Sequence, residues 1–221
     1  MNGTRLLRRV FALLLLLALI TGMTGCFTIT ISPRYVTLSD DYTTLTATPD
    51  SEKVYRIEID NMSFTNSKDV TIDIAYSDTP SVEAVVSEDL LDYGFKITMN
   101  NGVLRVGPSK HLEIRTDRFE LKIRARFDEI DFSGGYDVTV DAGGAQSLSL
   151  NVSGAANGSV ENLYVSDFDA KISGAGSFVL SGAADKATIH ISGAGDIEAA
   201  GLTCNALDAK ISGAGDMTIA V

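Results

Sequence analysis

One cluster of charged residues in the chain has side chains that could act on a polysaccharide. Asp128, Glu129 and Asp131 lie in the segment RARFDEID, together with Arg124 and Arg126. Glycoside-cleaving enzymes place two carboxylates on one face, and a nearby basic group can hold an acidic sugar. The same charges also suit the edge of a sheet, where they resist pairing with other sheets. We favour the charged strand edge, and a polysaccharide-acting enzyme is the lesser alternative.

A second set of polar residues recurs after a glycine-rich phrase. Repeats of the form Gly-Gly-x-Gly-x-Asp bind Ca²⁺, but their period is nine residues, whereas the period here is near 20. A cation shared by Asp196 and Asp216 stays open as an alternative to side-chain bonds with the backbone. We expect no cofactor and no metal. The polar ladder consists of Asp137, Asn157, Ser177, Asp196 and Asp216.

The remaining reactive residues form no constellation in the sequence. The two histidines, His111 and His190, are far apart, and no His, Cys and carboxylate residues have the spacing of a metal site. No nucleophile elbow or phosphate-binding loop is present. We therefore predict that the protein is not an enzyme.

The N-terminal segment predicts export from the cytoplasm. Arg5, Arg8 and Arg9 precede an apolar run of 11 residues from Val10 to Ile20. A membrane-spanning helix needs about 20 such residues, so the run is typical of a signal peptide. We assign residues 1–25 to this signal peptide.

The phrase MTGC at the end of this segment resembles the lipobox of bacterial lipoproteins. Thr24, Gly25 and Cys26 fit the pattern, and Met23 stands where Leu is commonest. The resemblance implies cleavage after Gly25 and acylation of Cys26, which would anchor the chain to the membrane. The alternative is an ordinary secreted protein. With Cys26 acylated, Cys204 has no disulfide partner, and we expect it to pack as a small hydrophobe.

The charge balance limits the partners. The formal net charge is −11, and without the three arginines of the signal peptide it is −14. Such a surface repels phosphate backbones and anionic lipid headgroups, so we expect no nucleic-acid partner. The expected location is extracytoplasmic, on the cell envelope.

The rest of the chain divides into a tether and strands. Residues 26–53, rich in Thr, Ser and Asp, are predicted to be the lipidated N-terminus and a tether, and residues 54–221 a folded domain. Segments with alternating apolar and polar residues predict stacked β-strands from Val54 onward. Ser87–Gly94 predicts one helical turn with Ser87 as N-cap, and Asn100–Gly102 a tight hairpin turn.

An apolar-Ser-Gly phrase repeats in the C-terminal half. It begins at Phe132, Val152, Ile172, Ile191 and Ile211, with spacings of 20, 20, 19 and 20 residues. This period favours stacked coils over a hairpin meander, because identical residues then lie on identical residues. The phrase predicts a corner that needs small residues, because neighbouring coils lie only about 4.8 Å apart and the chain turns sharply. We also expect the first glycine of each copy to have a positive φ, and the serines to cap the turn or bond to one another. The corner residues are Ser133, Gly134, Ser153, Gly154, Ser173, Gly174, Gly176, Ser192, Gly193, Gly195, Ser212, Gly213 and Gly215.

The residues flanking each corner predict which side chains face the core. Before the corner, alternate apolar residues such as Leu150, Ala170 and Ile189 point inward, and Asn151, Lys171, His190 and Lys210 point outward. After the corner, a buried column contains Val138, Phe178, Ile197 and Met217. Gly158 interrupts this column, and we expect Val160 to compensate.

The segments ATIHISGAGDIEAAGL and LDAKISGAGDMTIAV resemble the head GIN domain family of bacterial envelope proteins, also described as an auto-transporter adhesin head domain. The segments SVEAVVSEDLLDYGFKITMNNGVLRVG and FELKIRARFDEIDFSGGYDVTV extend the resemblance over residues 54–221. It implies an all-β fold, a right-handed parallel β-helix with coils of about 20 residues in the C-terminal half and stacked strands before it.

The resemblance leaves the molecular role open. We expect a lipid-anchored, adhesin-like binding module with a glycan or protein partner. The alternatives are an envelope sensor or regulator that partners a membrane signalling protein, and a purely structural lipoprotein. The last coil, ending at Ile219–Val221, could pair with a second copy through its edge.

Overall fold

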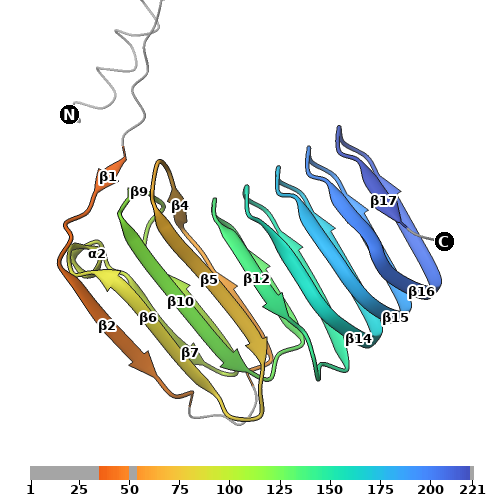
Figure 1. Ribbon diagram of the computed structural model, residues 1–221, viewed down its shortest axis with the longest axis horizontal. Helices are drawn as coiled ribbons and strands as arrows, with labels where there is room; N and C mark the ends of the chain where they lie inside the picture. The colour runs from red at the N-terminus through yellow and green to blue at the C-terminus, as the bar shows by residue number, and fades with distance from the viewer. Residues whose placement is uncertain (1–34, 50–53, 220–221) are drawn as a thin grey trace, which may run out of the picture. The chain divides into compact units, whose positions relative to one another are not determined.

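The strands of this protein form wherever apolar and polar residues alternate, and they dominate the chain (Figure 1). The computed structural model describes residues 35–49 and 54–219. The all-β prediction is confirmed, since α2 is the one helix within those ranges and has four residues. The elements are β1 (Val36–Thr37), β2 (Tyr42–Ala47), β3 (Arg56–Ile59), β4 (Met62–Phe64), β5 (Asp69–Tyr76), β6 (Ser81–Ser87), α2 (Asp89–Asp92), β7 (Lys96–Asn100), β8 (Val103–Gly107), β9 (Leu112–Arg115), β10 (Arg118–Ala125), β11 (Glu129–Phe132), β12 (Asp137–Asp141), β13 (Ser147–Val152), β14 (Asn157–Ile172), β15 (Phe178–Ile191), β16 (Ile197–Ile211) and β17 (Met217–Ile219).

Two local predictions have clear outcomes. The tight turn is confirmed: Asn101 and Gly102 have φ of 49° and 77°, and they join β7 to β8 as an antiparallel hairpin. Positive φ at both central residues gives the twist that flanking strands require. The helical turn also forms, but its N-cap is Glu88, which makes no side-chain capping bond. Ser87 instead ends β6 and is buried.

Part of the predicted tether belongs to the folded unit. Residues 42–47 form β2, which pairs antiparallel with β6, and residues 36–37 form β1, which pairs with β9. The segment YTTLTA alternates weakly because its apolar positions are only Leu45 and Ala47, both partly buried against the core. Among the described strands, β2 is the last on this side of the sheet and pairs on one edge only, and neither of its apolar residues is fully buried.

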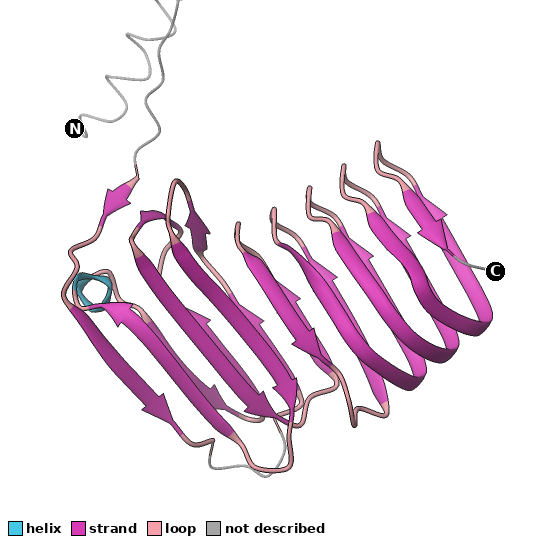
Figure 2. Ribbon diagram, viewed as in Figure 1, coloured by secondary structure: helices cyan, strands magenta, loops and turns pink. Residues whose placement is uncertain are grey.

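The N-terminal strands combine antiparallel and parallel pairing (Figure 2). The antiparallel pairs are β2–β6, β6–β10 and β7–β8. From β5 and β3 onward, every pairing in the large sheet is parallel. These parallel strands continue directly into the repeat, since β5 pairs with β12 and β3 with β11.

The repeat units lie on one another in parallel register. Val152 pairs with Ile172, Ile172 with Ile191, and Ile191 with Ile211, which are steps of 20, 19 and 20 residues. The long strands β14, β15 and β16 each contribute to two flanks of the stack: the first part of β14 pairs with β12 and its last part with β13. One hydrophobic core fills the space between the flanks, since alternate residues of both are buried.

The column after the corner is confirmed, but the predicted compensation at Gly158 is wrong. Val138, Gly158, Phe178, Ile197 and Met217 pair in succession as expected. Val160 lies in its own column, between Val140 and Leu180, where it is fully buried.

Aromatic rings flank the missing side chain of Gly158. Phe132 and Phe178 belong to the units on either side of it, and their rings are parallel, with centroids 6.2 Å apart. A Cβ on Gly158 would lie 2.0 Å from the Val138 carbonyl oxygen. Glycine is therefore required at this position, because the backbone of the preceding unit lies too close for a side chain.

Two predictions concern residues beyond the described part of the chain. The signal peptide and the acylated Cys26 lie outside it, as do residues 220–221. Among residues 35–49 and 54–219, no helix has the length and hydropathy that crossing a membrane requires.

Candidate binding groove

The corner glycines match one part of the prediction, the close spacing of the units, and contradict the other. In the described residues, the glycines with positive φ are Gly94, Gly102, Gly107, Gly144 and Gly182. None of these is a corner glycine, so the prediction of positive φ at Gly134, Gly154, Gly174, Gly193 and Gly213 is wrong.

Close stacking of the corners is what requires glycine. A Cβ on Gly174 or Gly213 would lie 1.7 Å from the carbonyl oxygen of the equivalent glycine one unit earlier. The second glycine of the phrase is equally confined, since a Cβ on Gly215 would lie 1.8 Å from the Gly195 oxygen. The amide of Ala175 donates to the Gly154 oxygen at 3.0 Å, so the backbone ladder continues through the corner. Only a residue without a side chain fits at this spacing.

The corner serines bond to the backbone of the neighbouring unit. The hydroxyls of Ser153, Ser173 and Ser212 each donate, at 3.4 Å, to the carbonyl of the apolar residue that ends the preceding unit's strand. Ser133, at the first corner, donates to the Asp60 carboxylate at 2.6 Å. The serine Oγ atoms therefore form a regular row at the stack surface.

The polar ladder is a set of bonds between successive units. The Asn157 amide donates to Asp137 at 3.3 Å, and its oxygen accepts the amide of Ser177 at 2.9 Å. The Asp196 carboxylate accepts the amide of Asp216 at 2.8 Å. Within the described ranges, no group of three or more His, Cys, Asp or Glu side chains is arranged to hold a metal ion. Asn157 and Asp196 therefore accept backbone amides of the next unit, and Asn157 also bonds to the Asp137 side chain.

The charged segment RARFDEID is not a strand edge, which corrects that interpretation. β11 lies between β3 and β13, and β10 lies between β5 and β6. Opposite charges on neighbouring strands pair instead. Arg56 of β3 contacts Glu129 at 2.7 Å and Asp131 at 3.5 Å.

The carboxylates of β11 are held in this network. Asn151 donates to Glu129 at 3.1 Å and to Asp131 at 2.7 Å. The hydrogen bond to Glu129 raises the pKa of Arg56, and burial raises the pKa of Asp131, which the Asn151 bond partly offsets. Arg124 pairs with Asp73, and Arg126 with Asp78. Both β11 carboxylates are therefore occupied by partners on adjacent strands.

The remaining candidates from the sequence lie apart from one another. His111 lies in the exposed loop between β8 and β9, and His190 is on β15. Cys204 of β16 is partly buried against the core, as expected for a small hydrophobe.

The outward side chains before the corners form one continuous row. Along the pairing register, Arg105, Glu58, Asp131, Asn151, Lys171, His190 and Lys210 follow one another across adjacent strands. The row is acidic and ion-paired at Glu58 and Asp131, and it becomes basic from Lys171 onward. It divides the outer face of this flank into an acidic part and a basic part.

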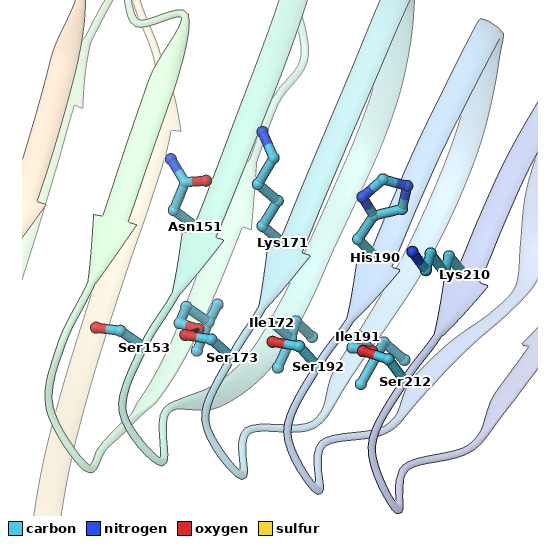
Figure 3. Close-up of a pocket in the computed structure, with 11 residues that line it drawn as sticks. Asn151, Ser153, Lys171, Ile172, Ser173, His190, Ile191, Ser192, Lys210 and Ser212 are labelled. Carbon is cyan, nitrogen blue, oxygen red and sulfur yellow. Dashed lines mark hydrogen bonds between the residues drawn. The ribbon is translucent and has the colours of Figure 1, made fainter.

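A groove lies between the basic end of this row and the row of corner serines (Figure 3). We call this the ladder groove. It has a volume of about 450 Å³ and is open to solvent. Figure 3 shows the two rows running side by side across successive units. The residues that line it are Asn151, Val152, Ser153, Lys171, Ile172, Ser173, His190, Ile191, Ser192, Lys210 and Ser212.

The polar side chains of the ladder groove are available to a ligand. Lys171 contacts Asp169 at 2.9 Å, yet its side chain is 58% exposed. Neither the His190 nor the Lys210 side chain has a hydrogen bond or ion pair to another described residue. Such groups can accept a partner without first breaking an existing contact.

The ladder groove was not predicted from the sequence. Asn151, Lys171, His190 and Lys210 were expected only to be solvated positions on the wet face, and the serines only to be part of the corners. The signal that could have found it is the residue before each apolar-Ser-Gly phrase, which is Asn151, Lys171, His190 and then Lys210. The same period that defines the corners places these side chains in one row.

Comparison with protein families gives a match over most of the described chain. The family model described as "Putative auto-transporter adhesin, head GIN domain" matches residues 63–221. No curated protein matches the sequence.

Several solved structures share the fold. A putative adhesin from Bacteroides fragilis NCTC 9343 is 20% identical, with a TM-score of 0.69 over 83% of this chain and 82% of that chain. A putative adhesin from Parabacteroides distasonis ATCC 8503 is 23% identical, with a TM-score of 0.54 over 83% of this chain and 84% of that chain. A putative lipid binding protein from the same strain is 13% identical, with a TM-score of 0.56 over 84% of this chain and 100% of that chain. At these identities the likeness concerns the fold.

Proposed function

This chain belongs to the head GIN domain family, and from that premise we propose that it is a lipid-anchored binding module of the bacterial cell envelope. It acts in the manner of an adhesin by holding a glycan or a protein, and it has no catalytic activity. Its location is extracytoplasmic, with the N-terminal lipid in the membrane and the folded unit exposed.

The ladder groove is the observation that supports a binding role. One row presents a serine hydroxyl and the other a polar side chain from each of four successive units, at the regular spacing of paired strands. A repeated surface of this kind suits an elongated or repetitive partner, as in other stacked architectures. The β11 carboxylates, by contrast, are held by Arg56 and Asn151, which supports a structural role for them.

A glycan and protein array tests the binding role. The full chain, purified in detergent, is applied beside a Lys171→Gln/Lys210→Gln variant and a Lys96→Gln/Lys122→Gln control that removes two exposed charges elsewhere. We expect dose-dependent binding that the groove variant loses and the control keeps. Binding to one membrane signalling protein from an envelope extract, with no array signal, would favour the regulatory alternative.

The lipid anchor is proposed from the lipobox resemblance at Cys26. In the producing bacterium, Cys26→Ser should abolish incorporation of labelled palmitate and move the protein from the membrane fraction. A Cys204→Ser variant is the matched control and should remain anchored. Unchanged membrane association of Cys26→Ser would contradict the anchor.

The handedness of the repeat is also proposed, as a right-handed parallel β-helix. The parallel register between successive units and the continuous long strands support it. Right-handed connections between parallel strands are strongly preferred because strands themselves twist in that sense. A crystal structure measures the handedness directly, and a left-handed path would contradict the proposal.

A homo-oligomer through the C-terminal edge is the last part of the proposal. Leu207 and Ile211 in the last long strand are 42% and 43% exposed, whereas their equivalents Ala187 and Ile191 in the preceding unit are buried. A second copy packed against this edge would cover both side chains in an isologous contact.

A further inference from the structure

We propose that the ladder groove binds a linear acidic polysaccharide through the carboxylate or sulfate groups of its repeating units. This inference rests on the proposed binding function and names the class of ligand for that site. It follows from the charges, the spacing and the hydrogen-bonding groups of the groove.

The first argument is the distribution of bonded cations. In the N-terminal half, Arg56 and Arg105 are held by carboxylates on adjacent strands, Glu129 and Glu58. In the ladder groove, the Lys210 side chain has no hydrogen bond or ion pair to another described residue, and the Lys171 side chain is 58% exposed. The groove therefore keeps positive charge available for an external anion.

The second argument is spacing. Lys171 and Lys210 are two units apart in the register, with His190 between them. Paired strands are about 4.8 Å apart, so the two lysines repeat at about 10 Å. That interval is comparable to the length of a disaccharide of β-linked pyranose rings. A polysaccharide with one acidic group per disaccharide can therefore place successive charges beside successive lysines.

The third argument excludes densely charged polyanions. Double-stranded DNA carries one negative charge per about 1.7 Å of its axis, far denser than this row. Asp169 and Asp208 occupy the column next to Lys171 and Lys210. These carboxylates repel a ligand charged at every position, but they tolerate one whose charges are separated by hydroxyl groups. The arrangement favours a sparsely charged chain.

The fourth argument concerns the uncharged parts of the ligand. The hydroxyls of Ser173 and Ser212 donate to backbone carbonyls, so their oxygen lone pairs can accept hydrogen bonds from sugar hydroxyls. None of the described residues that line the groove is Phe, Tyr or Trp, so recognition there does not use ring stacking on them. Recognition must then come from charge and hydrogen bonds, which makes a neutral glycan a poor ligand.

Calorimetry with defined oligosaccharides tests the inference. The probes are a hyaluronan octasaccharide with one carboxylate per disaccharide, a neutral chito-oligosaccharide of similar length, and an oligothymidylate. The full chain in detergent should bind only the hyaluronan octasaccharide, and raised salt should weaken binding. The Lys171→Gln/Lys210→Gln variant should bind about ten-fold more weakly, since each exposed ion pair contributes modestly.

Two further variants make the test sharper. His190→Lys adds a fixed charge to the middle of the row and should tighten binding by about three-fold. The Lys96→Gln/Lys122→Gln control should bind as the parent does. Thermal unfolding of each variant should match the parent, because the changed side chains are at the surface; a variant that unfolds early is replaced by its single substitutions.

The outcomes separate this inference from the function on which it rests. Equal binding of the neutral oligosaccharide or of oligothymidylate, or an equal loss in the control variant, overturns the acidic-polysaccharide inference. If no acidic glycan binds but another array ligand does and needs Lys171 and Lys210, the binding function stands and this inference fails. If nothing binds through the groove, both fail.

Discussion

At the scale of single residues, the buried hydroxyl of Tyr136 is satisfied by a partner far away in the sequence. The Tyr136 hydroxyl, in a side chain that is 5% exposed, donates to the Ile59 carbonyl at 2.7 Å. Burial raises the pKa of Tyr136 above its usual range, so the phenol remains a hydrogen-bond donor. The contact ties the first corner to a strand 77 residues earlier.

Removing this hydroxyl should reduce stability. Tyr136→Phe keeps the edge-on contact with Phe132 but loses the buried hydrogen bond. The Ile59 carbonyl still accepts the Ser133 amide, so we expect a loss of about 1 kcal/mol in the free energy of unfolding. Denaturant unfolding at neutral pH measures it. Tyr164→Phe, at a side chain that is 68% exposed, should change nothing, and an equal effect in both variants would contradict the argument.

Asp131 should make stability depend on pH. Burial raises the pKa of Asp131 in the folded state above its value in the unfolded chain. At pH values between these two pKa values, the folded chain therefore binds more protons than the unfolded chain. Its contribution is therefore most favourable below the unfolded pKa, about 3.9, and is lost as pH rises through the folded pKa. Asp131→Asn removes this dependence.

Unfolding of Asp131→Asn and the parent from about pH 3.5 to 6.5 tests the sign. The free energy of unfolding of the variant should rise relative to the parent as pH increases. The exposed Asp208→Asn change is the control. A difference between Asp131→Asn and the parent that is constant with pH would show that burial of Asp131 does not couple to folding.

At the scale of elements, the corner shows how a stacked fold selects its residues. The sequence predicts two requirements for the corner glycines, close spacing of the units and a positive φ, and only the spacing holds in the structure. Both explanations predict glycine at the same positions, so the sequence pattern alone cannot distinguish them. The distinction matters because an alanine would then be excluded by contact rather than by torsion.

Gly174→Ala should be among the most damaging single changes in the repeat. Its Cβ would lie 1.7 Å from the Gly154 carbonyl oxygen, with units packed on both sides. We expect a loss of about 3 kcal/mol, at the upper end for overpacking, measured by denaturant unfolding. Gly201→Ala is the control, since its nearest neighbour is the Ser181 Cβ at 3.2 Å.

Gly213→Ala gives a graded comparison. Its Cβ would also lie 1.7 Å from a backbone oxygen, but Gly213 is in the last described corner. That corner can move away from its one described neighbour, so its loss of stability should be clearly smaller than that of Gly174→Ala. Equal losses would mean that the last corner is as confined as the interior ones.

At the scale of the whole molecule, each repeat unit buries apolar side chains of the unit before it. Ile191 is 1% exposed beneath Ile211, whereas Ile211 itself is 43% exposed. Stability in such a stack is close to a sum of unit and interface contributions, and the outermost unit is the least protected. The same feature underlies the proposed self-association.

Self-association through this edge predicts a concentration-dependent mass. Light scattering of the full chain in detergent should show dimers at high concentration, and Leu207→Lys/Ile211→Lys should remain monomeric. Leu91→Lys, at a side chain that is 39% exposed on α2, is the matched control. A mass that stays monomeric across the concentration series would contradict the dimer.

The sequence by itself determined the strand class and the repeat register, because parallel stacking places residues 19 or 20 apart in direct contact. The period therefore indicates which residues are neighbours in the tertiary structure. It correctly predicted that Leu150, Ala170 and Ile189 lie in one column. The residues before each corner follow the same period, so the row of the ladder groove was also contained in the sequence.

Contacts between segments outside the repeat could be identified only from the tertiary structure. The β2 strand within the predicted tether, the Tyr136 bond to Ile59 and the pairing of Arg56 with Glu129 join segments up to 77 residues apart. Nothing in the local pattern marks such partners, because each contact depends on how non-repeating strands meet. The backbone dihedrals of the corner glycines were likewise decided by the tertiary structure, because close spacing and a positive φ both predict glycine at the same positions.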